Sequence, residues 1–234
     1  MSQLFLIPVT LGETPVSKVL PAYNREVILS LRHFIVENVR TARRFLKQTE
    51  ADINIDDLTF FTLNKHTSRE ELSGFLQPIS EGFSMGLLSE AGCPAIADPG
   101  ADVVALAQQK RIPVRPLVGP SSILLSLMAS GFNGQNFAFL GYLPIDSEQR
   151  IKTLKTLEQR TISTNQTQIF IETPYRNKAL AETILKTAKP STRFCIAADI
   201  TLETEWIQTR SIADWKKTKL PDLSKKPCIF LLGK

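Results

Sequence analysis

The chain has 234 residues, 43% of them hydrophobic, so it is long enough to bury one large core or two smaller ones. Its formal charge of +5 favours an anionic partner such as RNA without requiring one. The three cysteines, Cys93, Cys195 and Cys228, show neither a metal-binding nor a disulfide pattern, and no apolar run is long enough for a secretion signal or a membrane span. We therefore expect a globular protein of the reducing cytoplasm, with no membrane segment and no metal site.

The first half of the chain alternates apolar segments of strand length with segments of helical periodicity. We predict strands over residues 4–8, 33–37, 58–63, 83–88 and 112–118. We predict helices over residues 23–31, 39–47, 68–79 and 101–110, the second of which is basic. This repetition of strand, helix and strand predicts a mostly parallel sheet with helices on both faces.

Residues 87–100 cross from a buried strand into a helix. Ligands bind at such crossings in α/β proteins, because side chains and free backbone groups converge there. Ala91 and Gly92 leave the backbone open to close approach, while Ser89 and Glu90 supply a hydroxyl and a carboxylate. The sequence therefore predicts a ligand site here. The alternative is an ordinary polar loop that leads into a capped helix.

Asp98 is predicted as the N-cap of that helix, with Pro99 in the first turn.

A second crossing from strand to helix follows at residues 119–122, Gly-Pro-Ser-Ser. Ser121 and Ser122 lie where the first helical N–H groups have no partner within the helix, so amides and hydroxyls are available there to a polar ligand. Serines that simply cap their own helix are the alternative. Gly131 is predicted to end the helix.

The second half has a different pattern of elements. We predict strands over residues 136–143, 168–171, 194–197, 205–209 and 228–232, and helices over 123–130, about 147–157 and 177–186. Residues 200–208 leave little room for a crossover helix, so hairpins are expected to join some of the last strands into a mixed sheet. We place a boundary near Leu117, which gives α/β domains over residues 1–117 and 118–234.

Several motifs occur in the order and spacing seen in the tetrapyrrole methylase superfamily. They are Ser89-Glu90-Ala91-Gly92-Cys93-Pro94, Asp98-Pro99-Gly100, Pro116-Leu117-Val118-Gly119-Pro120-Ser121-Ser122 and Gly141-Tyr142-Leu143-Pro144. With Phe170-Ile171-Glu172-Thr173, they make the chain most similar to the ribosomal RNA small subunit methyltransferase I branch, and the match covers nearly the whole chain. The resemblance implies two α/β domains of the class III methyltransferase type, with S-adenosylmethionine in the cleft between them, and a homodimer.

The resemblance also implies which residues meet the cofactor. Position by position they are Pro8, Ser89, Glu90, Ala91, Gly92, Cys93, Ile96, Ser121, Ser122, Glu172, Thr173, Ala197, Ala198, Pro227 and Cys228. A zwitterionic amino-acid moiety needs amides and hydroxyls, whereas adenine needs a flat apolar slot with a few backbone partners. The two crossings, with their small and hydroxyl-bearing residues, suit both needs.

Three loops that face the acceptor in this family differ from the branch pattern. The branch's Pro-Thr-Pro-Ile-Gly-Asn-Leu is Pro-Val-Thr-Leu-Gly-Glu-Thr at residues 8–14. Its Glu-Asp-Thr-Arg is Glu-Asn-Val-Arg at residues 37–40, and its Ser-Asp-Ala-Gly is Ser-Glu-Ala-Gly at residues 89–92. The pattern indicates a kept cofactor site beside a changed acceptor site.

The branch implies methylation of a ribose 2′-hydroxyl in small-subunit ribosomal RNA. Because a hydroxyl is a poor nucleophile, a carboxylate in reach would accept its proton while an arginine holds the adjacent phosphate. We predict Glu37 and Glu90 as base candidates and Arg40 and Arg176 as phosphate or substrate clamps; the alternative for each is a structural ion pair. The basic segment 40–47 agrees with an RNA substrate.

Two other functions stay open. One is a methylase of a tetrapyrrole or another small molecule, for which we would expect an apolar cleft the size of a macrocycle. The other is a non-catalytic protein that binds the cofactor. A salt-dependent affinity for RNA would distinguish the RNA methyltransferase from the small-molecule methylase. Turnover would distinguish both enzymes from the non-catalytic protein.

Overall fold

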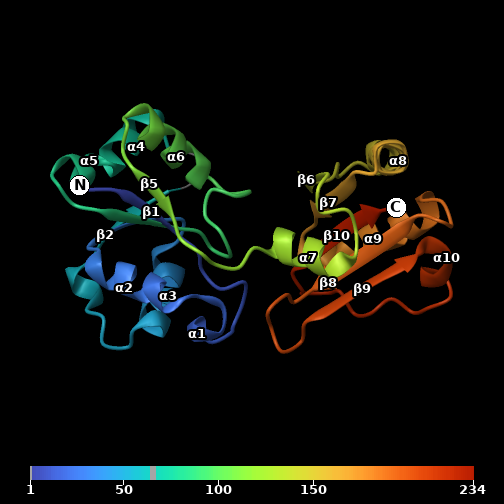
Figure 1. Ribbon diagram of the computed structural model, residues 1–234, viewed down its shortest axis with the longest axis horizontal. Coiled ribbons are helices and arrows are strands. Elements are labelled where there is room, and N and C mark those ends of the chain that lie inside the picture. Colours follow the sequence, from blue (N-terminus) through green and yellow to red (C-terminus); the bar gives the residue numbers. More distant parts are fainter. Residues whose placement is uncertain (1, 64–66) are drawn as a thin grey trace. The chain divides into compact units, whose positions relative to one another are not determined.

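The computed structural model describes residues 2–63 and 67–234, and the chain divides into two compact units, Met1–Ser121 and Ser122–Lys234. Each unit contains a five-stranded sheet (Figure 1). The division falls a few residues beyond the boundary that the sequence places near Leu117. The two units are described separately below.

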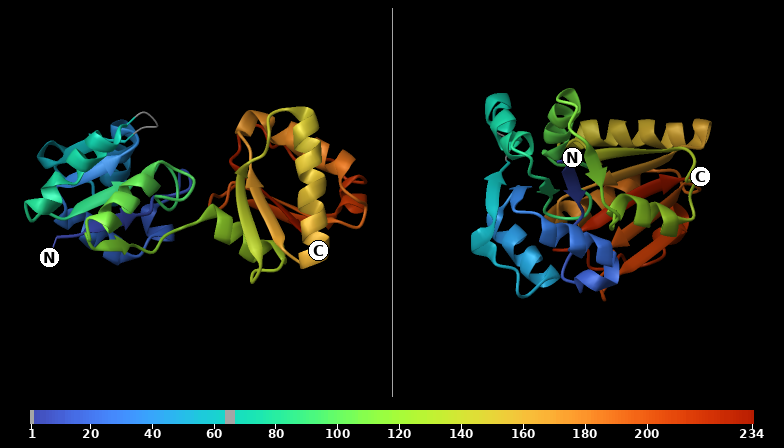
Figure 2. Two further views of the ribbon diagram at one scale, coloured as in Figure 1. Left: turned by 90° about the horizontal axis from the view of Figure 1, so that it is seen from above. Right: turned by 60° about the vertical axis from the view of Figure 1, so that its left-hand side comes forward.

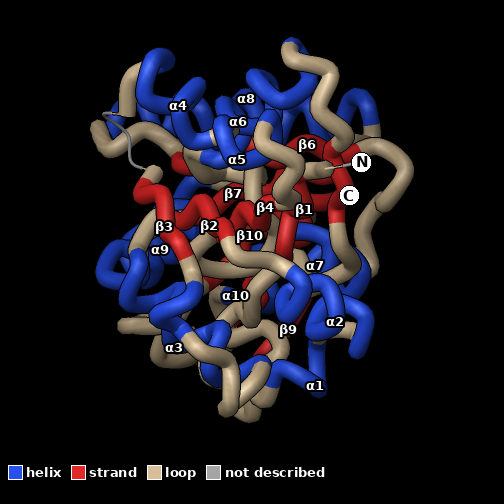
Figure 3. Tube along the Cα trace, turned by 90° about the vertical axis from the view of Figure 1, so that its left-hand side faces the viewer, coloured by secondary structure: helices blue, strands red, loops and turns tan. Residues whose placement is uncertain are grey.

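The sheet of the first unit is entirely parallel. Its strands are β1 (Leu4–Ile7), β2 (His33–Val36), β3 (Thr59–Thr62), β4 (Met85–Leu88) and β5 (Val114–Pro116). They pair in the order β3-β2-β4-β1-β5, which Figure 3 shows for the first four. The predicted parallel sheet is confirmed, and β4 lies at its centre.

Helices cover both faces of this sheet, as Figure 1 shows. One face packs against α1 (Val16–Val19), α2 (Ala22–Ser30) and α3 (Val39–Thr49), and the other against α4 (Arg69–Phe75), α5 (Gln77–Ser80) and α6 (Gly100–Gln109). Successive strand side chains point to opposite faces, so Phe34 and Val36 join the first core while Ile35 joins the second.

In this arrangement the connection that follows β4 runs over the opposite face from the connections that follow its two neighbouring strands, β1 and β2. The helices that follow β1 and β2 lie on one face of the sheet, whereas α6, which follows β4, lies on the other. Connections therefore diverge on both sides of β4 and leave a crevice beyond the strand ends. The topology thus identifies the loop after β4 as a ligand-binding position.

The second unit has a mixed sheet. Its strands are β6 (Phe137–Tyr142), β7 (Thr167–Ile171), β8 (Arg193–Ala198), β9 (Trp206–Ser211) and β10 (Cys228–Gly233). They pair in the order β6-β7-β10-β8-β9. Only β6 and β7 are parallel, and β8 and β9 form a hairpin. The predicted mixed sheet and its hairpin are confirmed.

Aromatic stacking builds the core of this unit. The rings of Phe170, Phe230 and Phe194 stack in turn across three neighbouring strands, with centroids 6.2 Å and 6.0 Å apart. The indole N–H of Trp215 donates to the Phe194 carbonyl oxygen at 2.8 Å. The helices of the unit are α7 (Ser122–Ser130), α8 (Ser147–Thr164), α9 (Asn177–Thr187) and α10 (Ile212–Trp215). In Figure 2, α8 is the long golden helix, which packs against β7, β10 and α9.

Some helix bounds differ from the prediction. The helix expected over residues 68–79 is divided into α4 and α5, because Pro78 has no N–H group and its ring opposes the carbonyl of Gly74 in a continuous helix. α8 continues past residue 157 to Thr164, because Glu158 is buried as an acceptor for the Lys189 N–H at 2.7 Å and the Thr192 hydroxyl at 2.5 Å. Among the described helices, none combines the length and apolar character needed to cross a membrane.

Gly119 lies where the chain leaves the first sheet and meets the end of β1. A Cβ atom on Gly119 would lie only 2.3 Å from Cβ of Pro8 and 2.6 Å from its Cγ. Pro8 is buried and its ring is rigid, so it cannot move aside cheaply. The two segments can approach this closely only because residue 119 has no side chain.

We predict that Gly119→Ala lowers the free energy of unfolding by about 1 to 3 kcal/mol, through overpacking against Pro8. Urea denaturation would report this as a lower midpoint. Gly74→Ala is the matched control, because its Cβ would meet nothing within 4 Å and alanine favours the helix. Equal midpoints for Gly119→Ala and the unsubstituted chain would contradict the contact.

Candidate active site

Contacts around Gly92 bring together loops that are far apart in the sequence. The N–H of Val9, after β1, donates to the Gly92 carbonyl oxygen at 2.9 Å. Gly92 has φ +71°, and a Cβ there would lie 3.0 Å from Leu11 Cδ2 and 3.3 Å from the Pro120 carbonyl oxygen. The thiol of Cys93 donates to the same oxygen at 3.4 Å. The two predicted crossings, 87–100 and 119–122, therefore meet at the end of β1.

The loop after β4 has a strained backbone that a carboxylate holds in place. Ala95 and Ala97 have positive φ angles of 67° and 62°, which cost energy in residues with a Cβ. Asp98 Oδ1 accepts the N–H groups of Ala95 and Gly100, each at 2.9 Å. The N-cap of α6 is Pro99, so the prediction of Asp98 as N-cap is wrong by one residue, because the helix begins only at Gly100.

The two predicted catalytic carboxylates lie side by side, because Glu37 follows β2 and Glu90 follows the adjacent strand β4. The Glu37 carboxylate accepts the backbone N–H of Glu90, and Thr41 Oγ1 donates to Glu90 Oε1 at 2.6 Å. Burial raises the pKa of Glu37, and the charges of Asp98 and Glu90 raise it further, although the N–H bond opposes them. Glu37 therefore keeps its proton to a higher pH than a free glutamate.

A hollow of about 200 Å³ opens beside these groups. It is lined by Val9, Thr10, Leu11, Gly12, Glu13, Thr41, Ala42, Arg44, Phe45, Gln48, Ser89 and Glu90. Arg44, rather than the predicted Arg40, lines this hollow, and Arg40 is exposed at the start of α3. Thr41, Arg44 and Gln48 recur at helical spacing, so the signal for this face was present in the sequence.

In the second unit, the predicted cofactor residues gather at one end of the sheet. Ile229 pairs with Ile171, and Cys228 pairs with Ala198, so the carboxyl ends of β7 and β8 flank the start of β10. The residues brought together are Glu172, Thr173, Ala197, Ala198, Pro227 and Cys228. Ser121 ends the first unit, and Ser122 begins α7 in the second.

Glu172 and Arg176 form an ion pair at this end of the sheet. The Glu172 side chain is fully buried, and its Oε1 atom accepts from Arg176 Nη2 at 2.6 Å and from the Thr173 N–H at 2.7 Å. The hydrogen bond and the charge of Glu172 raise the pKa of Arg176. The guanidinium also lies 5.3 Å from the Tyr175 ring centroid. Arg176 thus makes the structural ion pair that was the alternative to a clamp.

Further polar groups near this end of the sheet were missed in the sequence. Asp199 is buried, and its Oδ2 atom accepts from Lys226 Nζ at 2.5 Å and from the Thr204 hydroxyl at 2.8 Å. Asp199 and Lys226 are far apart in the sequence, so no local pattern predicts their pairing. Glu172 Oε2, Arg176 Nε and Thr201 Oγ1 are buried without a hydrogen-bond partner. Within the described residues, no group of three or more His, Cys, Asp or Glu side chains is arranged to hold a metal ion.

The predicted cofactor contacts differ in how accessible they are within their units. The side chains of Ala197 and Ala198 are buried in the sheet, and burial raises the pKa of the Cys228 thiol to about 12. Ala91 and Ile96, in the loop after β4, are exposed. Direct side-chain contact with a ligand is therefore easier at the first-unit loop than on β8.

Comparison with known proteins relates this arrangement to a family. No family model matches the chain. A Vibrio cholerae protein named "Ribosomal RNA small subunit methyltransferase I" is 31% identical over 189 residues, which are 81% of this chain and 62% of that protein. The protein of the same name from Halalkalibacterium halodurans is 33% identical over 141 residues, 59% of this chain and 47% of that protein. The chain spans about half to three fifths of the length of these relatives.

The fold agrees with this relationship. The crystal structure of uroporphyrin-III C-methyl transferase from Thermus thermophilus, complexed with S-adenyl homocysteine, matches with a TM-score of 0.59 at 15% identity over all of this chain and 98% of that one. The chain is similar in sequence to proteins named "Ribosomal RNA small subunit methyltransferase I" and shares its fold with the uroporphyrin-III C-methyl transferase. The predicted fold class, α/β of the class III methyltransferase type, is confirmed.

We predict that Glu37→Gln stabilises the chain at neutral pH. The folded state holds the Glu37 proton more tightly than the unfolded state, so the unsubstituted chain loses stability as pH rises through the raised pKa. Glutamine avoids that loss while keeping an oxygen for the Glu90 N–H. The gain should stay below about 1 kcal/mol, because solvent screens a partly exposed carboxylate.

Urea denaturation at pH values from about 4 to about 7 measures this effect. The advantage of Glu37→Gln should grow towards pH 7. Glu26→Gln, at an exposed position of α2, is the control and should show no such trend. If the urea midpoints of Glu37→Gln and the unsubstituted chain differ by the same amount at every pH, the raised pKa of Glu37 is contradicted.

We predict that Arg176→Ala destabilises the second unit, because it leaves the buried Glu172 carboxylate without its counter-charge. The urea midpoint should fall clearly. Adding Glu172→Gln should restore about half of the loss or more, because the neutral amide needs no ionic partner. Additive losses from the two substitutions would argue against a coupled pair.

Proposed function

We propose that the chain is an S-adenosylmethionine-dependent methyltransferase that modifies a ribose 2′-hydroxyl of small-subunit ribosomal RNA. The names of its relatives support this activity. The observation that carries it is the grouping of Glu37, Glu90, Arg44 and the loop at Gly92 at the carboxyl end of a parallel sheet. There a polar acceptor can meet carboxylates and a cation outside the strand ends.

The residues present fit this cofactor. Glu172 Oε2 and Thr201 Oγ1 are buried polar atoms without protein partners, and amino or hydroxyl groups of a ligand would satisfy them. Ala91 is exposed in the loop after β4 and its small side chain permits close approach, and Ile96, 54% exposed, offers apolar surface to an adenine ring. We propose that all fifteen positions implied by the resemblance form the cofactor site. The cofactor supplies an electrophilic methyl group on its sulfonium.

The chain's own contribution is to hold the acceptor and to take up its proton. We propose Glu90 as the general base, because it lines the hollow where a hydroxyl can reach it and the Thr41 hydroxyl fixes its carboxylate. Glu37, whose pKa is raised, is the second base candidate and also holds the Glu90 backbone. Holding the acceptor oxygen in line with the methyl, away from bulk water, supplies much of the remaining acceleration.

Cations on the first unit would hold the RNA phosphates. We propose that Arg40 and Arg44 bind phosphates on either side of the acceptor ribose, since both belong to the basic helix α3. Arg176 fits a clamp less well, because Glu172 already occupies its guanidinium. A mixed polar hollow of about 200 Å³ also favours a nucleotide over an apolar tetrapyrrole.

We further propose that the protein acts as a cytoplasmic homodimer, as the family resemblance implies. All three cysteines are free thiols, which suits a reducing compartment. The pKa values of Cys195 and Cys228, raised by burial to about 11 and about 12, keep these two thiols protonated and unreactive. Light scattering of the purified chain would measure its oligomeric state.

Two measurements on one preparation test the proposed function. Calorimetric titration with S-adenosylhomocysteine should show binding. Labelled methyl groups should then pass from S-adenosylmethionine to unmodified small-subunit particles, with the label recovered in a 2′-O-methylated nucleoside. Failure to bind would overturn the cofactor assignment, and binding without labelled RNA would overturn the acceptor assignment.

We predict that Glu90→Gln lowers kcat about 100- to 10,000-fold, because the acceptor hydroxyl loses its base. Affinity for S-adenosylhomocysteine should stay unchanged, as the amide fills the same space. Glu26→Gln, exposed on α2, is the matched control and should keep full turnover. Unchanged turnover in Glu90→Gln would remove Glu90 from the chemistry, and the same assay on Glu37→Gln then tests the second base.

A further inference from the structure

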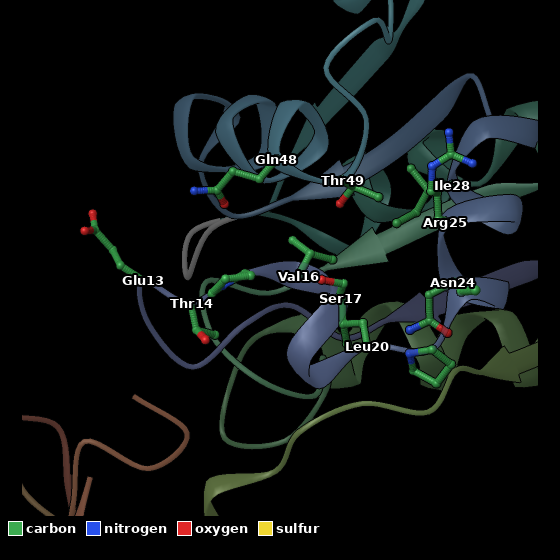
Figure 4. A pocket seen from close by; sticks show the side chains of 13 residues that line it. Glu13, Thr14, Val16, Ser17, Leu20, Asn24, Arg25, Ile28, Gln48 and Thr49 are labelled. Carbon is green, nitrogen blue, oxygen red and sulfur yellow. The ribbon is translucent and has the colours of Figure 1, made fainter. Parts of the chain in front are cut away.

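A larger hollow of about 720 Å³ lies in the first unit, and none of the predicted catalytic or cofactor-binding residues lines it. It is formed by the loop at residues 13–15, α1, the start of α2 and the end of α3. The lining residues are Glu13, Thr14, Pro15, Val16, Ser17, Leu20, Pro21, Ala22, Asn24, Arg25, Ile28, Gln48 and Thr49. Figure 4 shows Gln48 and Thr49 on α3, with Val16 and Ser17 of α1 below them.

This larger hollow adjoins the smaller one beside Glu90. Glu13 and Gln48 line both, so a chain-like ligand can pass from one to the other without leaving the surface. The carboxylate of Glu13 is exposed at the junction, where it can accept a hydrogen bond from a hydroxyl. A ribose 2′-hydroxyl is such a donor, and it distinguishes RNA from DNA.

The walls of the larger hollow combine apolar side chains with fixed polar groups. Leu20 and Ile28 are buried and supply an apolar wall. Asn24 is only 2% exposed, and its amide is fixed by a 2.8 Å bond to the Val118 carbonyl oxygen. Arg25 is held by an ion pair with Glu50. A cavity of this size with apolar walls and a few polar groups is typical of sites for nucleotide-sized molecules.

The exposed side of α3, the helix whose Gln48 lines both hollows, carries a cluster of cations. Arg40, Arg43, Arg44 and Lys47 all lie within this helix, and none takes part in an ion pair in the described part of the chain. Arg43 lies 5.5 Å from the Phe60 ring centroid, and Lys47 donates to the Ala51 carbonyl oxygen at 2.8 Å. Like charges three and four residues apart repel in the free helix, and a polyanion relieves that repulsion.

We infer that the larger hollow receives one unstacked nucleotide of the RNA strand that carries the acceptor ribose, while α3 contacts the connecting phosphates. This inference rests on the proposed function and specifies how its substrate is read. Proteins recognise RNA sequence mainly through bases that are splayed out of the strand into pockets. A flanking nucleotide held here would fix the position of the acceptor at Glu90.

Ser17→Tyr tests this inference, because Ser17 is exposed on α1 and a tyrosine there would fill the hollow. Ser80→Tyr is the matched control: the same substitution at an exposed position of α5 outside the hollow. Fluorescence anisotropy would measure the Kd of each variant for labelled single-stranded oligo(A) and oligo(U) at several salt concentrations. Calorimetry with S-adenosylhomocysteine on the same samples checks the cofactor site separately.

We expect Ser17→Tyr to raise the Kd for at least one oligoribonucleotide about tenfold, as is typical when contacts to one base are lost. Ser80→Tyr should leave the Kd unchanged, and the salt dependence should be the same in all three proteins, because no phosphate contact is altered. Ala22→Tyr, which enters the hollow from α2, gives a second variant should Ser17→Tyr not fold.

Other outcomes would overturn the inference. Equal Kd values for Ser17→Tyr and the unsubstituted chain would show that no nucleotide enters the hollow. Free nucleoside monophosphates that compete as well as the oligoribonucleotides would show a site for free nucleotides instead of an RNA strand. Methylation of small-subunit particles by a chain that binds neither oligoribonucleotide would also reject it. Failure of the proposed function can be told apart from failure of this inference. In that case the unsubstituted chain itself would not bind S-adenosylhomocysteine or would not label RNA.

Discussion

The geometry of the first unit depends on one crowded point at Gly92. There the backbone N–H of Val9 reaches a carbonyl oxygen of the loop after β4, while Leu11 and the carbonyl of Pro120 close around the same residue. Only a residue without Cβ, in a left-handed conformation, leaves room for these contacts. The same crowding fixes the direction in which the chain leaves β4. It therefore sets where Ser89 and Glu90 lie relative to the ends of β1 and β2.

The carboxylates at the strand ends of the two units have opposite electrostatic surroundings. In the first, Glu37 and Glu90 lie together, and burial, followed by repulsion from neighbouring carboxylates, raises the pKa of Glu37. In the second, Glu172 is fully buried but neutralised by Arg176. A carboxylate that ionises reluctantly can exchange a proton, whereas a neutralised one is better suited to holding a scaffold. This contrast supports the proposal that acid–base chemistry belongs to the first unit.

Features that depend on local pattern could be predicted from the sequence, and those that depend on distant partners could not. The crossing at residues 87–100 was recognised because an apolar strand, small residues and a helix follow one another directly. Arg44 could have been added to Arg40 as a candidate from helical spacing, which places Arg44 with Thr41 and Gln48. The burial of Glu158 depends on Thr192, and the pairing of Asp199 depends on Lys226, so neither leaves a local signal. Most cofactor positions came from motif resemblance, since composition alone does not distinguish Ala197 from any other buried alanine.

The basic helix α3 has a consequence for how this unit can evolve. Its cations repel one another in the free protein, so replacing Arg40 or Arg44 by a neutral residue would relieve repulsion within the helix. Selection for stability alone would remove such a cluster within a few substitutions. Affinity for a polyanion, as proposed above, would favour keeping it. On this view α3 is a compromise between folding and binding, and stabilising substitutions there are the ones that engineering of the protein should avoid.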